Sequence, residues 1–536
     1  MKEGNSAAKG VLILSIAGIL TKVISLLYVP FLRAILGQEG YGIYSQITEV
    51  FLFVYALTSV GAQPAVAKVV SEFIALEEYE EAERTLKISR NFYVFIGLIV
   101  GILMLLLAKP LTKLGNIPET AYGIMALAPC VVITAALSSY RGYMQGKMNM
   151  KAIGVSQILE QLINVFISLL FAFILVQFSL EFGAAGGQIG TSVGALFACF
   201  YIIYCRNEIE DEIEEFKEPR KEKRKSNKQI LRRVISYSIP IIISSGLQNF
   251  GGLVDMVNVK NRLLAAGFEK DMANILYGHY SLYKTLYGVP LILITAIGTT
   301  VLPTISRAMA VKDRKEIRRN IKYAFKVSLA IAIPAAVGLS MVSEEVYISL
   351  FGSTDGAKIM TIGSFIIILM TMTQIQNVIL QGINKFYFIV GSFSIGIMCK
   401  IIANYIFVGI PKINIYGAII GSTIWLIIPS ILNHIKIKKT MRMKLPLVRY
   451  IVKPVLASIA MALAILLIHQ PLKFIYRFIE PSRLTAIPVV IISVGVGVFI
   501  YAYLMILMRG ITKEDIQKIS PKIIRIMPRF MRRKLR

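Results

Sequence analysis

The sequence predicts an all-α integral membrane protein with fourteen transmembrane helices, arranged as two parallel, pseudo-symmetric six-helix lobes and two extra C-terminal helices. Three observations predict this class. Hydrophobic residues make up 56% of the 536 residues and charged residues only 17%, which is more apolar surface than a soluble domain needs. The apolar residues gather in long runs, and two distant stretches of the chain resemble each other.

An apolar run of about 20 residues can cross the hydrocarbon core of a bilayer as a helix. Fourteen such runs follow one another along the chain. They cover residues 10–32, 43–67, 91–108, 121–140, 152–176, 185–205, 234–256, 281–306, 327–342, 359–380, 387–408, 416–435, 454–469 and 485–508. On span six, Gly186, Gly190 and Gly194 at a spacing of four predict a face for close helix packing.

The two similar stretches are Tyr41-Gly-Ile-Tyr-Ser45 and Tyr277-Gly-His-Tyr-Ser281, which lie 236 residues apart. Each opens a long apolar span and is followed by a Gly and a Pro at nearly matching offsets. Internal duplication is common in membrane transporters, so this repeat indicates a duplicated bundle.

The connection at residues 206–233 is the long hydrophilic linker where two copies would join, acidic at 208–215 and basic at 220–225. Six spans in each copy give both copies the same orientation. The expected organisation is an N-terminal lobe at 1–205, a cytoplasmic linker at 206–233, a second lobe at 234–440, two further spans at 441–508 and a basic amphipathic cytoplasmic tail at 509–536. In the tail, Thr512-x-x-Asp515 predicts a helix N-cap, whereas residues 71–90 are expected to form a solvated connector.

Lys and Arg are distributed unevenly between alternate connections: 45 lie in the eight segments on one side and 11 in the seven on the other. Cytoplasmic loops retain positive charge during insertion. The count predicts a multi-pass protein of the cell membrane with both termini in the cytoplasm. The net charge of +28 then faces anionic membrane lipids, and nucleic acid is not expected as a partner.

Catalytic and metal-binding patterns are weak. The four Cys and three His are scattered, so neither a metal site nor a cofactor is predicted. The stretch from Gly142 to Lys147 lacks the spacing and the hydroxyl residue of a phosphate loop. We therefore expect a protein that is not an enzyme.

Charged residues inside the spans are the main functional signal, because each costs roughly 2.5–3.5 kcal/mol at mid-membrane and normally faces a partner or a wet cavity. The candidate substrate-binding residues are Lys22, Glu49, Gln63, Glu160, Asp255, Lys284 and Lys400. Further amides extend this polar lining, as would suit a sugar: Gln248, Asn249, Gln374, Gln376, Asn377 and Asn404. Four basic residues near span ends are expected to reach the membrane surface instead: Arg33, Arg141, Lys260 and Arg262.

Glu49 follows Tyr41 by eight residues and Lys284 follows Tyr277 by seven, so the two copies present opposite charges at nearly equivalent depths. Both would face a cavity enclosed by the repeats; the alternative is a buried structural pair. For Glu160, whose helical neighbours include Gln157, Gln161 and Asn164, hydrogen bonding between helices explains the polar stripe as well as a substrate does.

The segments LRAILGQEGYGIY at residues 32–44 and VGAQPAVAKVVSE at residues 60–72, with the 6+6+2 spans, resemble the stage V sporulation protein B family of polysaccharide exporters. That family belongs to the multidrug, oligosaccharidyl-lipid and polysaccharide (MOP) superfamily and is similar to the MurJ-type lipid II flippases. The resemblance implies a MATE- and MurJ-like fold. It implies a phosphate-facing role for Lys22. Lys284 aligns beside an Arg that is essential to flipping in the MurJ-type proteins, and Tyr28 stands where those proteins have a second Arg in span one.

The resemblance implies that the chain moves an undecaprenyl-pyrophosphate-linked saccharide, such as lipid II, across the cytoplasmic membrane by alternating access, with or without a coupling cation. It further implies a place in transport for peptidoglycan or polysaccharide biosynthesis, in building the cell wall or in sporulation. Two alternatives stay open: a cation-coupled multidrug antiporter of the same superfamily, and a membrane scaffold for wall-synthesis enzymes.

Overall fold

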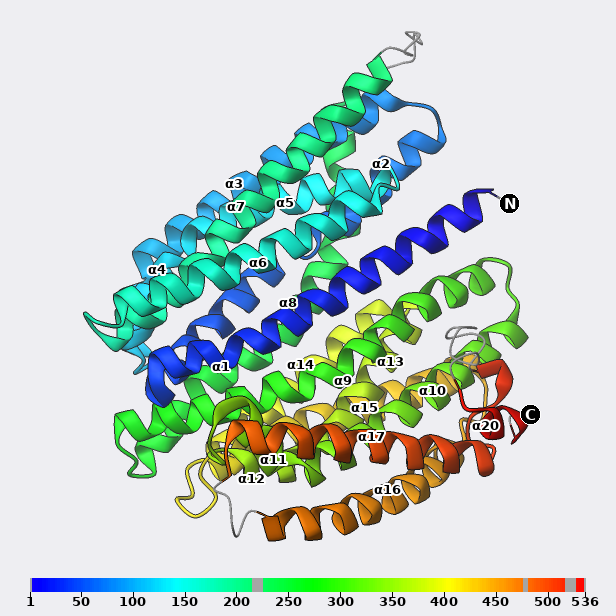
Figure 1. Ribbon diagram of the computed structural model, residues 1–536. Helices are drawn as coiled ribbons and strands as arrows, with labels where there is room; N and C mark the ends of the chain where they lie inside the picture. Colours follow the sequence, from blue (N-terminus) through cyan, green and yellow to red (C-terminus); the bar gives the residue numbers. More distant parts are fainter. Residues whose placement is uncertain (1, 215–224, 476–480, 516–526, 535–536) are drawn as a thin grey trace. The chain divides into compact units, whose positions relative to one another are not determined.

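The computed structural model describes residues 2–214, 225–475, 481–515 and 527–534, and every regular element in these ranges is a helix (Figure 1). The elements are α1 Lys2–Thr58, α2 Ala62–Ala75, α3 Tyr79–Leu114, the 3₁₀ turn η1 Pro118–Thr120, α4 Ala121–Ala126, α5 Ala128–Gly146, α6 Met150–Leu175, α7 Leu180–Glu214, α8 Asn227–Ala265, α9 Lys270–Ala310, α10 Arg314–Met341, α11 Ser343–Phe351, α12 Ala357–Gly363, α13 Ile366–Gly382, α14 Phe386–Phe407, α15 Tyr416–Met441, α16 Leu447–Ile475, α17 Arg483–Leu507 and α20 Arg529–Lys534.

The length and composition of these helices confirm a membrane protein that crosses the bilayer many times. In the described part of the chain, 11 helical segments are long and apolar enough to span a membrane, or 12 if the bent pair α12 and α13 forms one span. The first two predicted spans share α1, which is interrupted at Gly37 (φ 70°). Glycine adopts this left-handed conformation without the steric cost that a side chain would add.

The helices form two compact units, residues 1–278 and 279–536. In the first unit α3 packs on α5 and α6 packs on α7, and Figure 1 shows these helices running alongside one another. The glycine face predicted on span six is confirmed, because Cβ atoms at Gly186, Gly190 and Gly194 of α7 would collide with the backbone of α6. These glycines let α6, which carries Glu160, approach α7 closely.

The second unit is built on α10, which packs against α13 and α16, while α14 packs on α15. Its core is apolar and includes Ile321 and Phe325 of α10 and Ile375 and Ile379 of α13, each at most 1% exposed. The last two predicted spans are α16 and α17, which pack on each other. The side of α16 that meets α10 attaches this extra helix pair to the unit.

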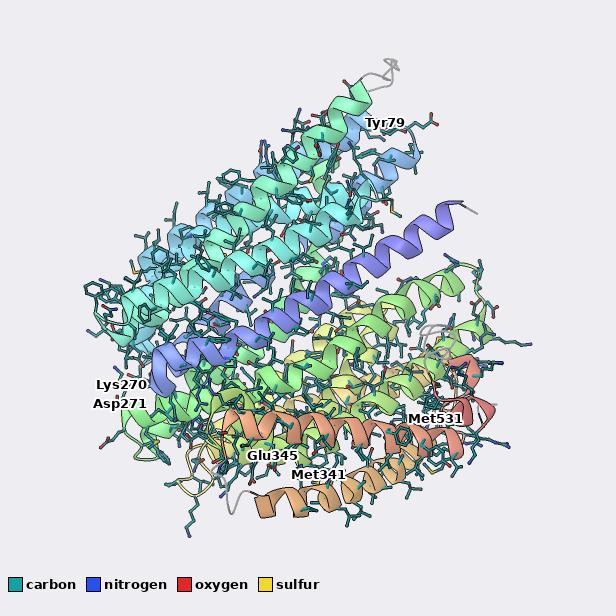
Figure 2. All side chains as sticks on the ribbon, viewed as in Figure 1. Tyr79, Lys270, Asp271, Met341, Glu345 and Met531 are labelled. Atoms are coloured by element: carbon teal, nitrogen blue, oxygen red, sulfur yellow. The ribbon has the colours of Figure 1, made fainter. Side chains whose placement is uncertain are left out.

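Figure 2 shows labelled residues from predicted inward and outward connections lying apart within each unit. In the first unit Tyr79 lies at one end, and Lys270 and Asp271 at the other. In the second unit Glu345 lies away from Met531. Which of these ends faces the cytoplasm stays a prediction from the charge count.

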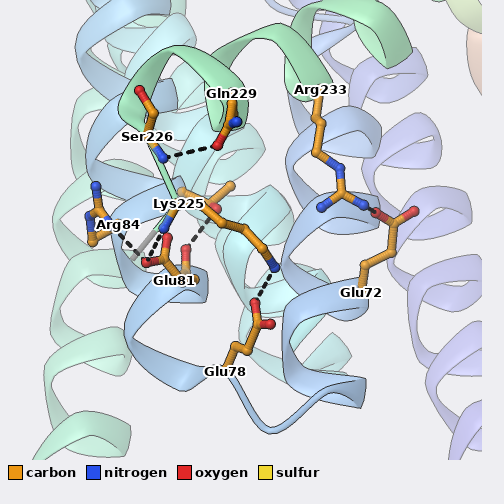
Figure 3. A network of polar contacts seen from close by, with 9 residues as sticks. Glu72, Glu78, Glu81, Arg84, Lys225, Ser226, Gln229 and Arg233 are labelled. Atoms are coloured by element: carbon orange, nitrogen blue, oxygen red, sulfur yellow. Dashed lines mark hydrogen bonds and ion pairs between the residues drawn. The ribbon is translucent and has the colours of Figure 1, made fainter. Parts of the chain in front are cut away.

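The connector at residues 71–90 is not merely solvated, because its acidic side chains bind the start of α8 (Figure 3). Lys225 Nζ lies 2.5 Å from Glu78 Oε2, and Arg233 Nη2 lies 2.9 Å from Glu72 Oε2. The backbone N–H of Lys225 donates to Glu81 at 3.3 Å. The basic end of the 206–233 linker is therefore anchored to α2 and α3, while its residues 215–224 lie outside the described ranges.

Candidate functional site

Within the first unit, Gly42 of the first motif copy lies against Gly278, which opens the second copy with Tyr277. A Cβ atom on Gly278 would lie 3.2 Å from the backbone of Gly42, and one on Gly42 would collide with the carbonyl of Asn274. The Asn274 side chain accepts a hydrogen bond from Gln46 at 3.2 Å and donates one to Glu39 at 3.3 Å. The single glycine of each copy thus permits a close helix crossing, and the Asn274 side chain bridges Gln46 and Glu39 beside it.

Two candidate acidic residues lie where α1 and α8 pack together. Glu49 of α1 is 9% exposed and Asp255 of α8 is 1% exposed. Gly252 of α8 makes room for the Glu49 carboxylate, since a Cβ atom at that position would overlap it. Residues three apart share a helix face, so Asp255 lies one turn from Gly252 on that side of α8. The unit therefore buries two carboxylates along one helix pair.

Glu160 of α6 forms an ion pair with Arg141 of α5. Arg141 Nη2 lies 2.7 Å from Glu160 Oε2, and Arg141 Nε donates to the hydroxyl of Ser156 at 2.9 Å. Arg141 is only 6% exposed, so the prediction that it reaches the membrane surface was wrong. The reason is tertiary: Gly142 packs tightly against α2, and the neighbouring guanidinium points to α6.

Lys260, at the other end of the unit, was also predicted to reach the membrane surface, and that prediction was wrong as well. Its side chain is fully buried and pairs with Glu119, which also accepts Lys270 at 3.1 Å. Asn261 donates to the carbonyl of Gly115 at 3.2 Å and binds the same loop. The turn at η1 folds back onto α8 and supplies the carboxylate, which spacing in the sequence does not reveal.

The remaining candidates of the first unit differ in environment. Lys22 lies on the exposed surface of α1. Gln63 of α2 is half-buried and donates to Gln145 of α5 at 2.9 Å. Five of the seven candidates thus belong to the first unit and two, Lys284 and Lys400, to the second.

The two lysines of the second unit each lie over an aromatic ring. Lys284 Nζ is 5.2 Å from the ring centre of Tyr280, and Lys400 Nζ is 4.6 Å from that of Trp425. The Tyr280 and Ser422 hydroxyls are 2.9 Å apart, which joins α9 to the α15 helix that also carries Trp425. Lys400 is 2% exposed. A contact between a cation and an aromatic face stabilises the cation by about 2 kcal/mol or more when water is excluded.

Several predicted lining amides join helices of the second unit. Gln376 of α13 donates to the carbonyl of Ser430 on α15 at 3.0 Å, and Asn433 donates to Asn377 at 3.3 Å. Gln374 donates to Thr295 at 2.7 Å. Amide contacts of this kind stabilise helix packing in an apolar setting. Their role toward a substrate stays a prediction.

Comparison with known proteins identifies the family. The model of the polysaccharide biosynthesis protein family matches residues 7–309, which is more than half of the chain. The lipid II flippase MurJ of Bacillus subtilis (strain 168) is 24% identical over 507 residues, covering 90% of this chain and 92% of that protein. Stage V sporulation protein B of the same organism is 23% identical over 444 residues, covering 82% and 85%.

Solved structures agree with this assignment at the level of the fold. An inward-closed lipid II flippase MurJ superposes with a TM-score of 0.62 at 17% identity, covering 93% of this chain and 99% of that one. An inward-facing MATE multidrug transporter of the MOP superfamily gives a TM-score of 0.64 at 16% identity, covering 81% and 98%. The chain has a MATE- and MurJ-like fold and belongs to the polysaccharide biosynthesis protein family.

Proposed function

We propose that the chain is a flippase for an undecaprenyl-pyrophosphate-linked cell-wall precursor, either lipid II or a related lipid-linked oligosaccharide. It would move this substrate across the cytoplasmic membrane by alternating access. The observation that carries the proposal is that two lysines on predicted membrane spans of the second unit, the half-buried Lys284 and the buried Lys400, each lie over an aromatic ring. A buried cation is costly, and an anionic substrate such as a pyrophosphate gives it a function. The likeness to the MurJ flippase over 507 residues supports the same conclusion.

Each candidate residue has a role in this proposal. Lys22 and Lys284 hold the pyrophosphate, with Lys400 as a further cation. Glu49, Gln63, Glu160 and Asp255 offer carboxylates and an amide to the hydroxyl and amide groups of the saccharide or peptide. The cycle needs no nucleotide; its energy comes from sodium, protons or the membrane potential. Anionic lipids surround the basic cytoplasmic loops.

We extend the proposal to the topology. The chain crosses the membrane fourteen times, as two parallel six-helix repeats and two extra helices, with both termini in the cytoplasm. The asymmetry of Lys and Arg between alternate connections supports this arrangement.

A cation-coupled multidrug antiporter is the second candidate, supported by the buried carboxylates Glu49 and Asp255 and by the similarity in fold to a MATE transporter. Buried carboxylates of this kind can hold a cation or a proton. A membrane scaffold is the third candidate, in which the ion pair of Arg141 and Glu160 would be purely structural.

The test substitutes Lys22→Ala and Lys284→Ala and measures the leaflet accessibility of labelled lipid II in cells that depend on this protein. Loss of a charge-assisted contact of about 1.5–3 kcal/mol predicts at least a tenfold fall in flipping at normal abundance. Lys315→Ala, an exposed lysine outside the spans, is the matched control and should keep full flipping.

The outcomes separate the candidates. Unchanged flipping together with altered assembly of wall-synthesis enzymes would support the scaffold. Cation-dependent efflux of drugs without movement of lipid II would support the antiporter.

A further inference from the structure

The cytoplasmic end predicted for the second unit carries an open hollow that the proposed transport path does not use. Its volume is about 450 Å³, and it lies at the end of α15 and in the turn that follows. The lining residues are Ile435, Lys438, Lys439, Arg442, Met443 and Lys444. The four cations among them are exposed, and within the described residues no ion pair joins them to a carboxylate.

An apolar stripe on α15 leads into this hollow. Ile427, Ile431 and Ile435 follow one another at a spacing of four and are 38%, 55% and 56% exposed. The next position of the same helix face is Lys439. With a rise of 1.5 Å per residue, the stripe offers about 12 Å of apolar surface before the first cations. This order, apolar and then cationic, matches a lipid tail joined to an anionic headgroup.

The end of α15 is held in place by Arg318 of α10. Arg318 Nη2 donates to the carbonyls of Met441 at 2.9 Å and Arg442 at 3.0 Å, and its Nε reaches Met441 at 3.2 Å. The last carbonyls of a helix carry partial negative charge and repel anions. Arg318 covers two of these carbonyls, those of Met441 and Arg442, and this lessens the repulsion of an anion beside the helix end.

Arg442 occupies a backbone position that usually belongs to glycine. It caps α15 in the left-handed conformation, with φ 46° and ψ 53°. Glycine would adopt this conformation without steric cost. The same left-handed conformation occurs at Lys312 and Arg509, so it shapes the turn after α15 and does not by itself mark a binding position.

We propose that this hollow binds the phosphodiester headgroup of an anionic phospholipid of the cytoplasmic leaflet, with one acyl chain along Ile427, Ile431 and Ile435. The side of the membrane follows from the predicted topology, and anionic lipids are enriched in that leaflet. The adjoining apolar stripe favours a membrane lipid over a soluble phosphate ester. This lipid site is separate from the site proposed for the transported cargo. The lipid-binding test therefore does not depend on whether the chain is a flippase.

The test compares two triple variants of the full chain. Lys438→Gln, Lys439→Gln and Lys444→Gln remove three charges from the hollow, and Lys312→Gln, Lys315→Gln and Lys322→Gln remove three exposed charges of the same predicted side. Phosphatidylglycerol or phosphatidylcholine is titrated into purified protein, and bound lipid is measured by native mass spectrometry and by the thermal midpoint. The hollow variant should bind phosphatidylglycerol about tenfold more weakly, whereas the control should stay within twofold of the parent. Equal losses in both variants would overturn the site.

A second variant separates binding from folding. Arg442→Gly relieves the left-handed strain while it removes a cation. Without lipid its thermal midpoint should equal or exceed that of the parent, and its gain on adding phosphatidylglycerol should fall. A full gain would overturn the role of Arg442.

Two further ligands identify the source of the phosphate. If glycerol 3-phosphate alone gives the whole stabilisation, the hollow is a soluble-anion site and the lipid assignment fails. If undecaprenyl pyrophosphate binds there more tightly than phosphatidylglycerol, the assignment to phospholipid fails as well.

Discussion

Two buried cations of this protein are stabilised by specific carboxylate partners. Arg141 and Lys260 lie near predicted span ends, where an isolated side chain would extend to the membrane surface. Instead Arg141 binds Glu160 and Lys260 binds Glu119. The sequence identified Glu160 as notable but could not identify its partner, because the two residues belong to different helices.

The Arg141–Glu160 pair can be tested by removing one or both charges. Glu160→Gln leaves an uncompensated buried guanidinium, so we expect a loss of about 3–5 kcal/mol in stability. The double variant Arg141→Met with Glu160→Met should recover much of that loss, since no unpaired charge remains. Thermal unfolding in detergent measures both. A double variant less stable than Glu160→Gln would contradict a pairing role.

Asp515 gives a prediction for pH. Its carboxylate accepts a hydrogen bond from Lys326 at 2.5 Å. It also accepts one from the backbone N–H of Thr512 at 2.9 Å and one from the Thr512 hydroxyl at 2.7 Å. The backbone N–H of Asp515 donates back to that hydroxyl at 3.4 Å, and this reciprocal pair confirms the predicted cap. Burial raises the Asp515 pKa, but these bonds together hold it below the ordinary 3.8.

A depressed carboxyl pKa adds stability above pH 3.8 that is lost as the pH falls through the pKa of the folded state. Asp515→Asn at neutral pH should therefore reproduce the acid effect. The measurement is amide hydrogen exchange of residues 509–515. Equal protection of these amides in parent and variant at pH 7 would contradict a stabilising role for the contact between Lys326 and Asp515.

At the scale of the elements, the positions of the helices follow from the sequence, while their breaks and crossings depend on tertiary contacts. Apolar runs located the spans, but α1 continues to Thr58 through Gly37, and the span that was predicted at 359–380 bends by 52° between α12 and α13. The glycines of α7 could be predicted from their spacing. The crossing of the two repeated motifs at Gly42 and Gly278 could not, because it joins residues 236 positions apart.

The close approach of the helices at Gly42 and Gly278 predicts that one added methyl group at Gly42 lowers the stability of the protein. Gly42→Ala forces the new Cβ atom against the carbonyl of Asn274, and overpacking of this kind costs about 1–3 kcal/mol. Gly495→Ala is the control, because nothing lies within 4 Å of a Cβ atom there. It should be neutral or gain about 0.5–1 kcal/mol from helix propensity. Equal thermal midpoints for both variants would contradict the tight crossing.

At the scale of the whole molecule, the orientation in the membrane decides which leaflet each predicted site faces. The structure describes two compact units, and their orientation stays a prediction from the distribution of Lys and Arg. The sequence can make this prediction because cytoplasmic loops retain positive charge when segments insert into a bilayer. Residues 516–526 of the basic amphipathic tail predicted at 509–536 lie outside the described ranges.

Single cysteines test the topology after the four native cysteines have been replaced. A membrane-impermeant thiol reagent on intact cells should label Met272→Cys and Leu484→Cys, which belong to predicted outward connections. It should not label Ser226→Cys or Lys513→Cys until the membrane is opened. Labelling of Ser226→Cys on intact cells would place the linker outside and reverse the orientation.

The sequence by itself determined that this chain is an all-helical membrane protein, where most of its spans lie and to which family it is similar. These properties depend on local composition, on charge in loops and on short motifs. Only the tertiary structure decided that Arg141 and Lys260 are buried in ion pairs, that the repeated motifs cross at Gly42 and Gly278, and that four cations surround a hollow at the end of α15. Such contacts join residues far apart in the chain, and no local pattern specifies which distant group will be the partner.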